Sequence, residues 1–92
     1  MKTTPINELI NVFSKVDNAD SMKKLFEELF TPSERKNLSL RWQLMKMIYR
    51  KVPQREIASD LKISLCKITR GAKVLKNPKS ITKNILQKIE KT

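Results

Sequence analysis

Residues 54–75 read QREIASDLKISLCKITRGAKVL, and this stretch decides the fold of the 92-residue chain. Its spacing predicts two short helices, Gln54–Leu61 and Leu65–Lys76, that cross steeply as a helix-turn-helix. A steep crossing requires a small side chain at the point of contact, and Ala58 supplies it. The apolar wedge that fixes the second helix against the first is expected from Leu61, Ile63 and Ile68.

The turn of this motif departs from the usual pattern. Glycine often fills the left-handed position of such a turn, whereas this chain has Lys62. A left-handed backbone costs a residue with a side chain roughly 1 kcal/mol, so we expect a distorted or mobile turn. After the turn, Ser64 is placed to cap the second helix.

Helices are also predicted on both sides of the motif. Apolar residues repeat at steps of three and four over 6–16 and again over 22–29, where Asp20 or Ser21 can cap the helix. A last helix follows the break at Asn77 and Pro78. Its apolar positions are Ile81, Ile85, Leu86 and Ile89.

The third helix has the strongest start signal in the sequence. Thr31 and Glu34 can form a reciprocal capping box, and Pro32 suits the first helical position. This helix should run to about Arg50. Its inward residues are expected to be Leu38, Met45 and Ile48, with Trp42 and Tyr49 on a neighbouring stripe. Six helices without strands predict an all-α fold class.

Charge is distributed unevenly along the chain, whose formal net charge is +11. Residues 1–34 carry four Lys and Arg against six Asp and Glu, whereas residues 35–92 carry sixteen against three. The second part therefore has a net charge of +13 and suits a polyanion, which favours a nucleic acid as the partner. The alternative explanation of the charge is a lysine-rich background composition.

Composition disfavours several classes of protein. A single cysteine, Cys66, cannot form an internal disulfide, and a chain without histidine lacks the usual ligand set for structural zinc, so we expect no metal. The missing histidine and the scattered carboxylates also argue against an enzyme. No apolar run is long enough to span a bilayer, and residues 1–20 lack a signal-peptide core, so we expect a cytoplasmic location.

The helix-turn-helix predicts double-stranded DNA as the partner, because the N-terminal residues of its second helix lie nearest the base edges of the major groove. The candidates for that position are Ser64, Leu65, Cys66, Lys67 and Thr69. Arg55 can reach a guanine edge or a phosphate from the start of the first helix, and Gln54 beside it is a further DNA-binding candidate. Phosphates are the expected contacts of Lys62, Lys73 and Lys76.

Four pieces of the sequence occur in the order and near the spacing of a known family. They are FTPSER at 30–35, Arg41, QREI at 54–57 and ITRG at 68–71. Over about residues 22–92 the chain therefore resembles the bacterial tryptophan repressor family.

This resemblance implies a single DNA-binding domain, 1–92, that forms an intertwined homodimer. Residues 1–51 would supply mainly dimerisation helices, 54–76 the helix-turn-helix, and 78–92 a C-terminal dimerisation helix. Dimerisation has support beyond the resemblance, because a short chain whose helices carry single apolar stripes gains a larger core by pairing.

The resemblance also implies L-tryptophan as a co-repressor ligand. In the family the indole lies between two arginine side chains, which Arg41 and Arg70 match, and the Arg70 position also meets the ligand carboxylate. Guanidinium planes suit this task, because they stack on aromatic rings better than lysine does. The other matched positions are the hydroxyl of Thr31, the backbone carbonyls near Glu28 and Phe30, Gly71 beside the indole, and Val74 near the ammonium.

Two matched positions depart from the family pattern. Val74 stands where the family can place a serine that assists the ligand ammonium, and Lys67 stands where a threonine lies between ligand and DNA. The resemblance predicts a tryptophan-dependent transcriptional repressor of tryptophan biosynthesis or uptake genes. The closest alternative is a helix-turn-helix regulator of the same fold without a tryptophan ligand, and a second is an RNA-binding or ribosome-associated basic protein.

Overall fold

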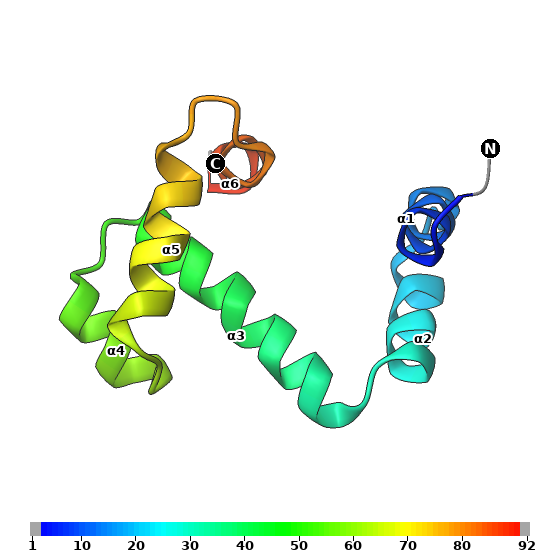
Figure 1. Cartoon of the computed structure of the whole chain (residues 1–92), viewed down its shortest axis with the longest axis horizontal. Helices are drawn as coiled ribbons and strands as arrows, with labels where there is room; N and C mark the ends of the chain where they lie inside the picture. Colours follow the sequence, from blue (N-terminus) through cyan, green and yellow to red (C-terminus); the bar gives the residue numbers. More distant parts are fainter. Residues whose placement is uncertain (1–2, 91–92) are drawn as a thin grey trace. The chain divides into compact units, whose positions relative to one another are not determined.

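The structure is a computed structural model that describes residues 3–90, and over these residues it contains helices and no strand (Figure 1). The six helices are α1 (Pro5–Lys15), α2 (Ala19–Leu29), α3 (Pro32–Tyr49), α4 (Gln54–Leu61), α5 (Leu65–Lys76) and α6 (Ile81–Glu90). The all-α prediction is confirmed. The chain divides into two compact units, an N-terminal unit that ends at Lys36 and a C-terminal unit that begins at Asn37.

Side-chain caps start both helices of the N-terminal unit. Thr4 accepts a hydrogen bond from the Asn7 amide at 3.3 Å before α1, and Asn18 accepts one from the Ser21 amide at 2.8 Å before α2. The expectation that Asp20 or Ser21 caps α2 is wrong. The carboxamide of Asn18 already satisfies the Ser21 amide, so the helix begins earlier, at Ala19.

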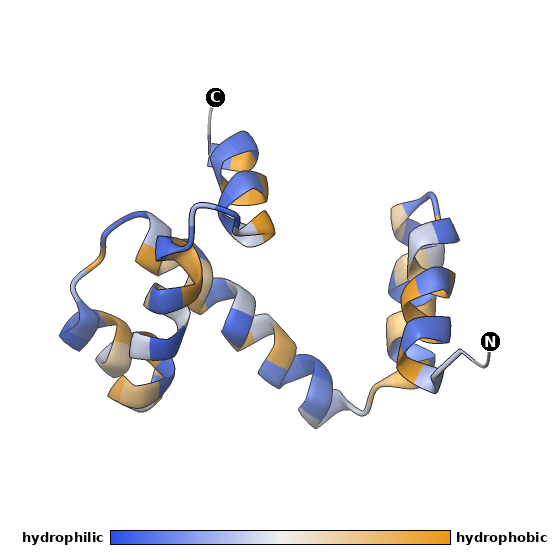
Figure 2. Cartoon of the chain, turned by 45° about the horizontal axis from the view of Figure 1, so that its top comes forward, coloured by the Kyte–Doolittle hydropathy of each residue, from blue (hydrophilic) through white to orange (hydrophobic). Residues whose placement is uncertain are grey.

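Neither α1 nor α2 contains a buried residue. Phe13 stacks on Phe26 with the ring centroids 5.5 Å apart, but Ile6 and Ile10 remain 62% and 55% exposed. Figure 2 shows the apolar positions of each helix alternating with polar ones, as expected for helices that bury a single stripe. The apolar stripe of α1 is therefore only partly covered within its own unit.

The predicted capping box at the start of α3 is confirmed. Thr31 donates its backbone amide to the Glu34 carboxylate at 2.9 Å, and the Glu34 amide donates to the Thr31 hydroxyl at 3.1 Å. Arg35 also secures this junction, because its Nη1 donates to the carbonyl oxygens of Phe30 at 2.7 Å and Glu27 at 3.0 Å. Together these bonds satisfy backbone groups that the end of α2 and the start of α3 leave free.

The C-terminal unit has two groups of buried apolar side chains. The first core cluster consists of Leu44, Ile57, Leu61 and Ile68, with Ala58 and Ile63 packed against it. The predicted wedge and the small contact residue of the helix-turn-helix are thus confirmed. The second core cluster consists of Met45, Leu75 and Leu86, which joins α3, α5 and α6.

One expectation about α3 is wrong. Leu38 was expected to point inward, but its side chain is 41% exposed, whereas Leu44 is buried. Leu44 and Met45 are adjacent in sequence and enter different core clusters, so α3 buries two faces rather than one stripe. Leu38 lies one to two turns before them and belongs to neither cluster.

The expectation of a distorted turn in the helix-turn-helix is also wrong. Lys62 has φ 54° and ψ 47°, which is regular left-handed geometry, and the turn keeps the standard form despite its side chain. The next helix begins as predicted, since the Ser64 hydroxyl accepts the Lys67 amide at 3.4 Å. A second left-handed residue, Lys51 with φ 62°, follows the end of α3 and was not predicted.

An ion pair joins the ends of α3 and α6. Arg50 donates from Nε to Oε1 of Glu90 at 2.6 Å and from Nη2 to Oε2 at 3.2 Å. This paired hydrogen bond and the charge of Arg50 hold the pKa of Glu90 below its usual range. Arg50 lies just after the last residue of α3, Tyr49, in agreement with the predicted end at about Arg50.

Candidate ligand groove and nucleic-acid interface

The helix-turn-helix carries every predicted DNA-binding side chain on its exposed surface. Gln54 and Arg55 occupy the first turn of α4, and Lys62 forms the turn between the helices. The exposed residues at the start and along the first half of α5 are Ser64, Leu65, Cys66, Lys67 and Thr69; Lys73 and Lys76 follow in its second half.

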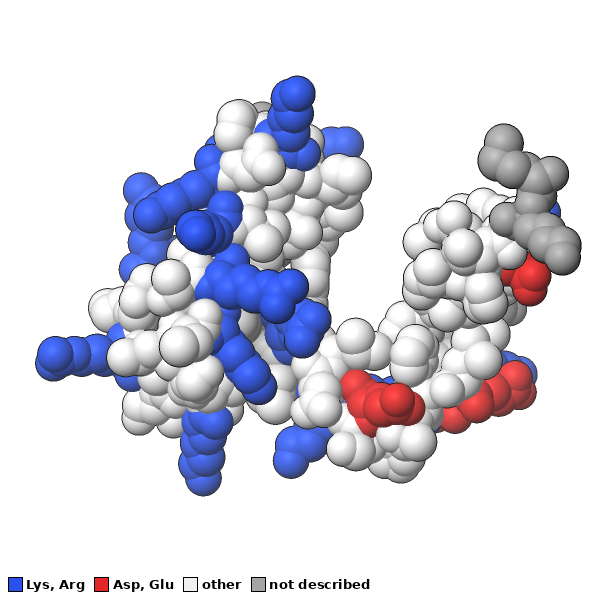
Figure 3. Space-filling view, viewed as in Figure 1, with Lys and Arg blue, Asp and Glu red and all other residues white. Residues whose placement is uncertain are grey.

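Positive charge dominates the C-terminal unit. Figure 3 shows Lys and Arg side chains gathered over this unit on the face in view, whereas the acidic side chains seen on that face belong to the N-terminal helices. From residue 37 onward the sequence has only three acids, Glu56, Asp60 and Glu90, and Glu90 is engaged by Arg50. The surface of α4 and α5 is therefore electrostatically suited to a phosphate backbone.

A groove of about 610 Å³ lies in the C-terminal unit between α3 and α5, and we call it the first groove. Arg41 of α3 and Arg70 of α5 both line it, which brings together the two arginines singled out in the sequence. Apolar side chains form most of the remaining lining, with Gly71 among them. These are Leu38, Leu40, Trp42, Leu44, Met45, Ile63 and Val74.

The charged lining of the first groove is entirely cationic. Lys67 lines it together with the two arginines, and its lining contains no Asp or Glu. Its neutral polar groups come from Asn37 and Thr82. A groove with an apolar floor and cationic edges suits a flat apolar group that carries a carboxylate.

Gly71 of α5 is buried against side chains of α3. A Cβ atom at this position would lie 2.9 Å from Cδ1 of Ile48 and 3.2 Å from Sδ of Met45. Carbon atoms in contact normally lie about 3.5–4.0 Å apart, so a side chain here would push the two helices or their side chains apart. Helix packing therefore explains the glycine on its own, while a role beside an indole stays a prediction.

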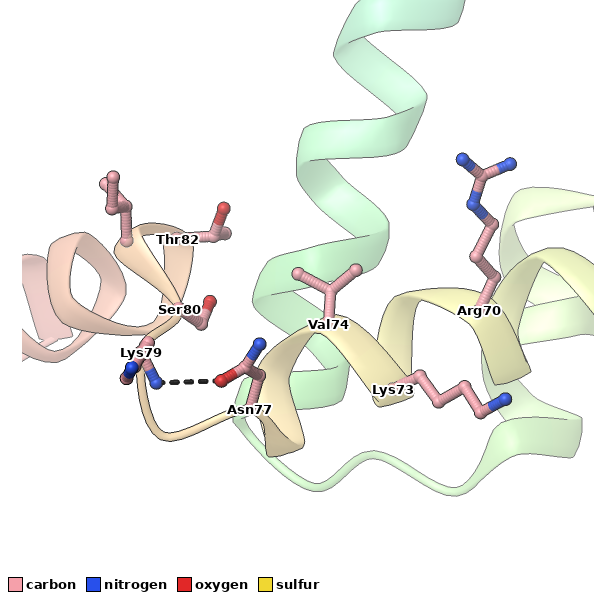
Figure 4. A pocket seen from close by; sticks show the side chains of 8 residues that line it. Arg70, Lys73, Val74, Asn77, Lys79, Ser80 and Thr82 are labelled. Atoms are coloured by element: carbon pink, nitrogen blue, oxygen red, sulfur yellow. Dashed lines mark hydrogen bonds between the residues drawn. The ribbon is translucent and has the colours of Figure 1, made fainter.

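A second groove of about 570 Å³ adjoins the first and was not predicted from the sequence. The two grooves share Arg70, Val74 and Thr82 in their linings. Figure 4 shows the second groove at the turn from α5 to α6, where the Lys79 amide donates to the Asn77 side chain at 2.9 Å. Ser80, which is buried beside this turn, accepts the Lys83 amide at 3.1 Å and caps α6.

Three predicted ligand-binding residues belong to the N-terminal unit. These are Glu28, Phe30 and Thr31, and of these groups the Phe30 carbonyl and the Thr31 hydroxyl already accept hydrogen bonds within that unit. The sequence reasoning missed Leu38, Trp42 and Thr82 as lining residues. Leu38 and Trp42 share a helical face with Arg41 and Met45, at steps of three, four and seven residues, so periodicity alone could have placed them in the groove.

Two further observations concern the described part of the chain. Among residues 3–90 no three His, Cys, Asp or Glu side chains gather in a set that could hold a metal ion. None of the helices in this range has both the length and the apolar character that crossing a bilayer requires.

Comparisons with known proteins point to one family. The family model described as Trp repressor protein matches residues 4–90. A Trp operon repressor homolog of Xylella fastidiosa (strain M23) is 40% identical over 65 residues, which cover 70% of this chain and 71% of the relative. A Trp operon repressor homolog of Chlamydia trachomatis serovar D is 31% identical over 80 residues, which cover 86% of this chain and 85% of the relative.

The family match extends further toward the N-terminus than the motifs that suggested it, since it begins at residue 4 rather than near residue 22. No solved structure matches the chain at a significant level. The six-helix fold, the exposed helix-turn-helix and the match over nearly the whole chain agree with one another. The chain therefore belongs to the Trp repressor protein family of DNA-binding transcriptional repressors.

Proposed function

We propose that the chain is a homodimeric repressor whose operator binding depends on L-tryptophan and controls genes of tryptophan biosynthesis or uptake. One observation carries this proposal: Arg41 and Arg70, from two different helices, line the same apolar groove. Planar guanidinium groups can hold an aromatic ring by stacking and cation–π contacts. Arg70 can also pair with the ligand carboxylate through two parallel hydrogen bonds.

The remaining ligand contacts rest on the resemblance to the family alone. We place the ligand ammonium against the backbone carbonyls near Glu28 and Phe30, and the Thr31 hydroxyl beside the ligand. The Phe30 carbonyl already accepts a hydrogen bond from Arg35, but a carbonyl oxygen has two lone pairs and can accept another from an ammonium. Val74 would offer the ligand only an apolar contact, in place of the hydroxyl that a serine would provide.

The position of the first groove suggests how ligand and DNA are coupled. One side of the groove is α5, the helix that would enter the major groove, so a ligand held there would fix the tilt of α5. Two such helices in a dimer would fit half-sites about 34 Å apart, as in helix-turn-helix repressors generally, of which this family is itself a standard example. By linkage, operator DNA would tighten tryptophan binding by the same factor by which tryptophan tightens DNA binding.

Unburied apolar surface supports the homodimer. Neither α1 nor α2 buries a residue, and along α6 the side chains of Ile81, Ile85 and Ile89 are 73%, 44% and 53% exposed. These three isoleucines recur every four residues and so share one face of α6. A second copy of the chain would cover such faces with matching ones, in a two-fold symmetric arrangement.

A second candidate function is a regulator of the same fold that needs no tryptophan. Lys67 favours this alternative, because it adds a third cation to the lining of the first groove where the family can place a neutral residue. An ammonium group there would repel the ammonium of an amino-acid ligand. The two candidate functions therefore predict different ligand binding and the same DNA binding.

Isothermal titration of the purified protein with L-tryptophan separates the candidates, with amino acids that lack an indole as controls. We expect saturable binding of about one tryptophan per chain, abolished in Arg70→Leu. Arg55→Ala is the matched control, since it removes an exposed arginine of α4 outside the groove and should weaken operator binding while tryptophan binding persists. Sequence-specific DNA binding without tryptophan binding would support the ligand-independent regulator instead.

A further inference from the structure

The first turn of α5 exposes an apolar side chain in a region of cations. Leu65 is 53% exposed and belongs to neither core cluster, and the neighbouring Cys66 is exposed as well. Leu65 is the first residue of α5, the helix whose N-terminal end faces the base edges when a helix-turn-helix docks. About half of this leucine therefore remains open to a partner outside the described chain.

The polar residues of the same turn are partly committed to the helix itself. The Ser64 hydroxyl oxygen accepts the Lys67 amide at 3.4 Å, and the Thr69 hydroxyl donates to the Leu65 carbonyl at 2.9 Å. Ser64 keeps its proton and one lone pair for an outside partner, whereas Thr69 keeps only acceptor capacity. The Thr69 hydroxyl therefore cannot donate to a base edge while it holds this bond.

Among residues 64–69 of the described chain, Lys67 alone is of a type that reads a base through paired hydrogen bonds. Guanine is usually read by arginine and adenine by asparagine or glutamine, whereas 64–69 contain Ser, Leu, Cys, Lys, Ile and Thr. Ile68 is fully buried, so Lys67 is the one charged side chain exposed there. The other direct means of reading a base in the major groove is apolar contact with the 5-methyl group of thymine.

The charged side chains around Leu65 indicate what kind of partner covers it. Arg55, Lys62, Lys67 and Lys73 are exposed on the same helix pair, which favours a polyanion over an apolar protein partner. The floor of a DNA major groove combines apolar thymine methyl groups with flanking phosphates, and it matches this arrangement of one apolar contact among cations.

We infer that Leu65 is a specificity-determining residue that contacts the 5-methyl group of a thymine in each operator half-site, with Cys66 extending the same apolar contact. The inference rests on the proposed function only in that α5 must dock in the major groove; it requires no particular ligand. Burial of one methyl group is worth about 0.8 kcal/mol, so each contacted thymine should contribute about fourfold in affinity.

The test replaces thymine by deoxyuridine, which removes the methyl group and keeps the hydrogen-bonding edge. The full-length protein, with saturating tryptophan, first selects its preferred sequences from a pool of random DNA duplexes. The selected duplex is then prepared in two forms, one made with dTTP and one with dUTP instead of dTTP. The affinity of each form is measured for the original protein, Leu65→Ala and Leu65→Met. Lys76→Ala is the control, because we assign Lys76 to phosphate contacts alone.

The original protein should bind the deoxyuridine duplex at least fourfold more weakly. Leu65→Ala should show a clearly smaller preference than the original protein, because only the smaller apolar contacts of the introduced alanine and of Cys66 would remain. Leu65→Met should retain the preference, and Lys76→Ala should weaken binding to both duplexes by the same factor. Equal binding of the two duplexes by the original protein, or a full preference in Leu65→Ala, would overturn the inference and leave the proposed repressor standing. If no sequence is enriched from the pool, both the inference and the sequence-specific repressor fail.

Discussion

The left-handed turn at Lys62 allows a prediction that separates the effect of the backbone conformation on stability from the effect of the side chain. Lys62 has φ 54° and ψ 47°, a conformation that costs a residue with a Cβ atom roughly 1 kcal/mol and costs glycine little. Lys62→Gly should therefore raise the free energy of unfolding by about 1 kcal/mol. For a chain of this size that corresponds to a rise in Tm of about 4–8 °C.

Lys62→Ala is the matched control, because it also removes the exposed ammonium group and keeps the left-handed strain. Its free energy of unfolding should stay within about 0.5 kcal/mol of the original, as for most surface substitutions. Both variants should lose the same phosphate contact and bind operator DNA equally weakly. Thermal unfolding followed by circular dichroism, at one fixed protein concentration, measures the stability difference between the two variants.

The result that would refute this reasoning is equal stability of Lys62→Gly and Lys62→Ala. That outcome would mean that the turn relaxes to another conformation at no cost, so its left-handed form is not imposed by the packing of α4 against α5. Lys51→Gly extends the test, because Lys51 has the same kind of backbone, with φ 62°, outside the helix-turn-helix. It should stabilise the protein by a similar amount without any effect on DNA binding.

Three further predictions follow from the contacts of the C-terminal unit. Gly71→Ala places a methyl group 2.9 Å from Cδ1 of Ile48, and Ile48→Val removes that atom, so the two substitutions should be more favourable together than separately by about 1 kcal/mol in a double-mutant cycle of unfolding free energies. Arg50 lowers the pKa of Glu90 in the folded state. The contribution of Glu90 to stability is therefore present above the ordinary glutamate pKa and is lost as the pH falls through the lowered value. Urea unfolding across this pH range should show a weaker pH dependence of stability in Glu90→Gln. Operator affinity should fall steeply with salt, and Lys76→Ala should reduce the slope of log K against log salt by about 2 per dimer, whereas an unchanged slope would remove Lys76 from the phosphate contacts.

Much of the fold could be predicted because its signals are local. The ends of α4 and α5, the Ser64 cap and the capping box of Thr31 and Glu34 each depend on residues a few positions apart, and the structure has all of them. The start of α2 was missed by two or three positions, because Asn18, Asp20 and Ser21 are all good caps and the sequence does not rank them.

Features that depend on distant residues were not predictable in this way. The ion pair of Arg50 and Glu90 joins residues 40 positions apart, and the exposure of Leu38 depends on which elements pack against α3. In the candidate site, sequence motifs found Arg41 and Arg70, and the structure places both in one groove. Thr82 joins that groove only because the turn after α5 brings α6 back beside it, which no local pattern encodes.

In the proposed homodimer, the lack of any buried residue in α1 and α2 would make the amount of protein in the cell a variable of control. If a second chain covers this apolar surface, the folded state of the segment would be coupled to association by mass action. Dilution would loosen these helices first, while the cluster around Leu44 and Ile57, complete within one chain, would persist. The copy number of the chain, and not its co-repressor alone, would then set how many complete repressors are present.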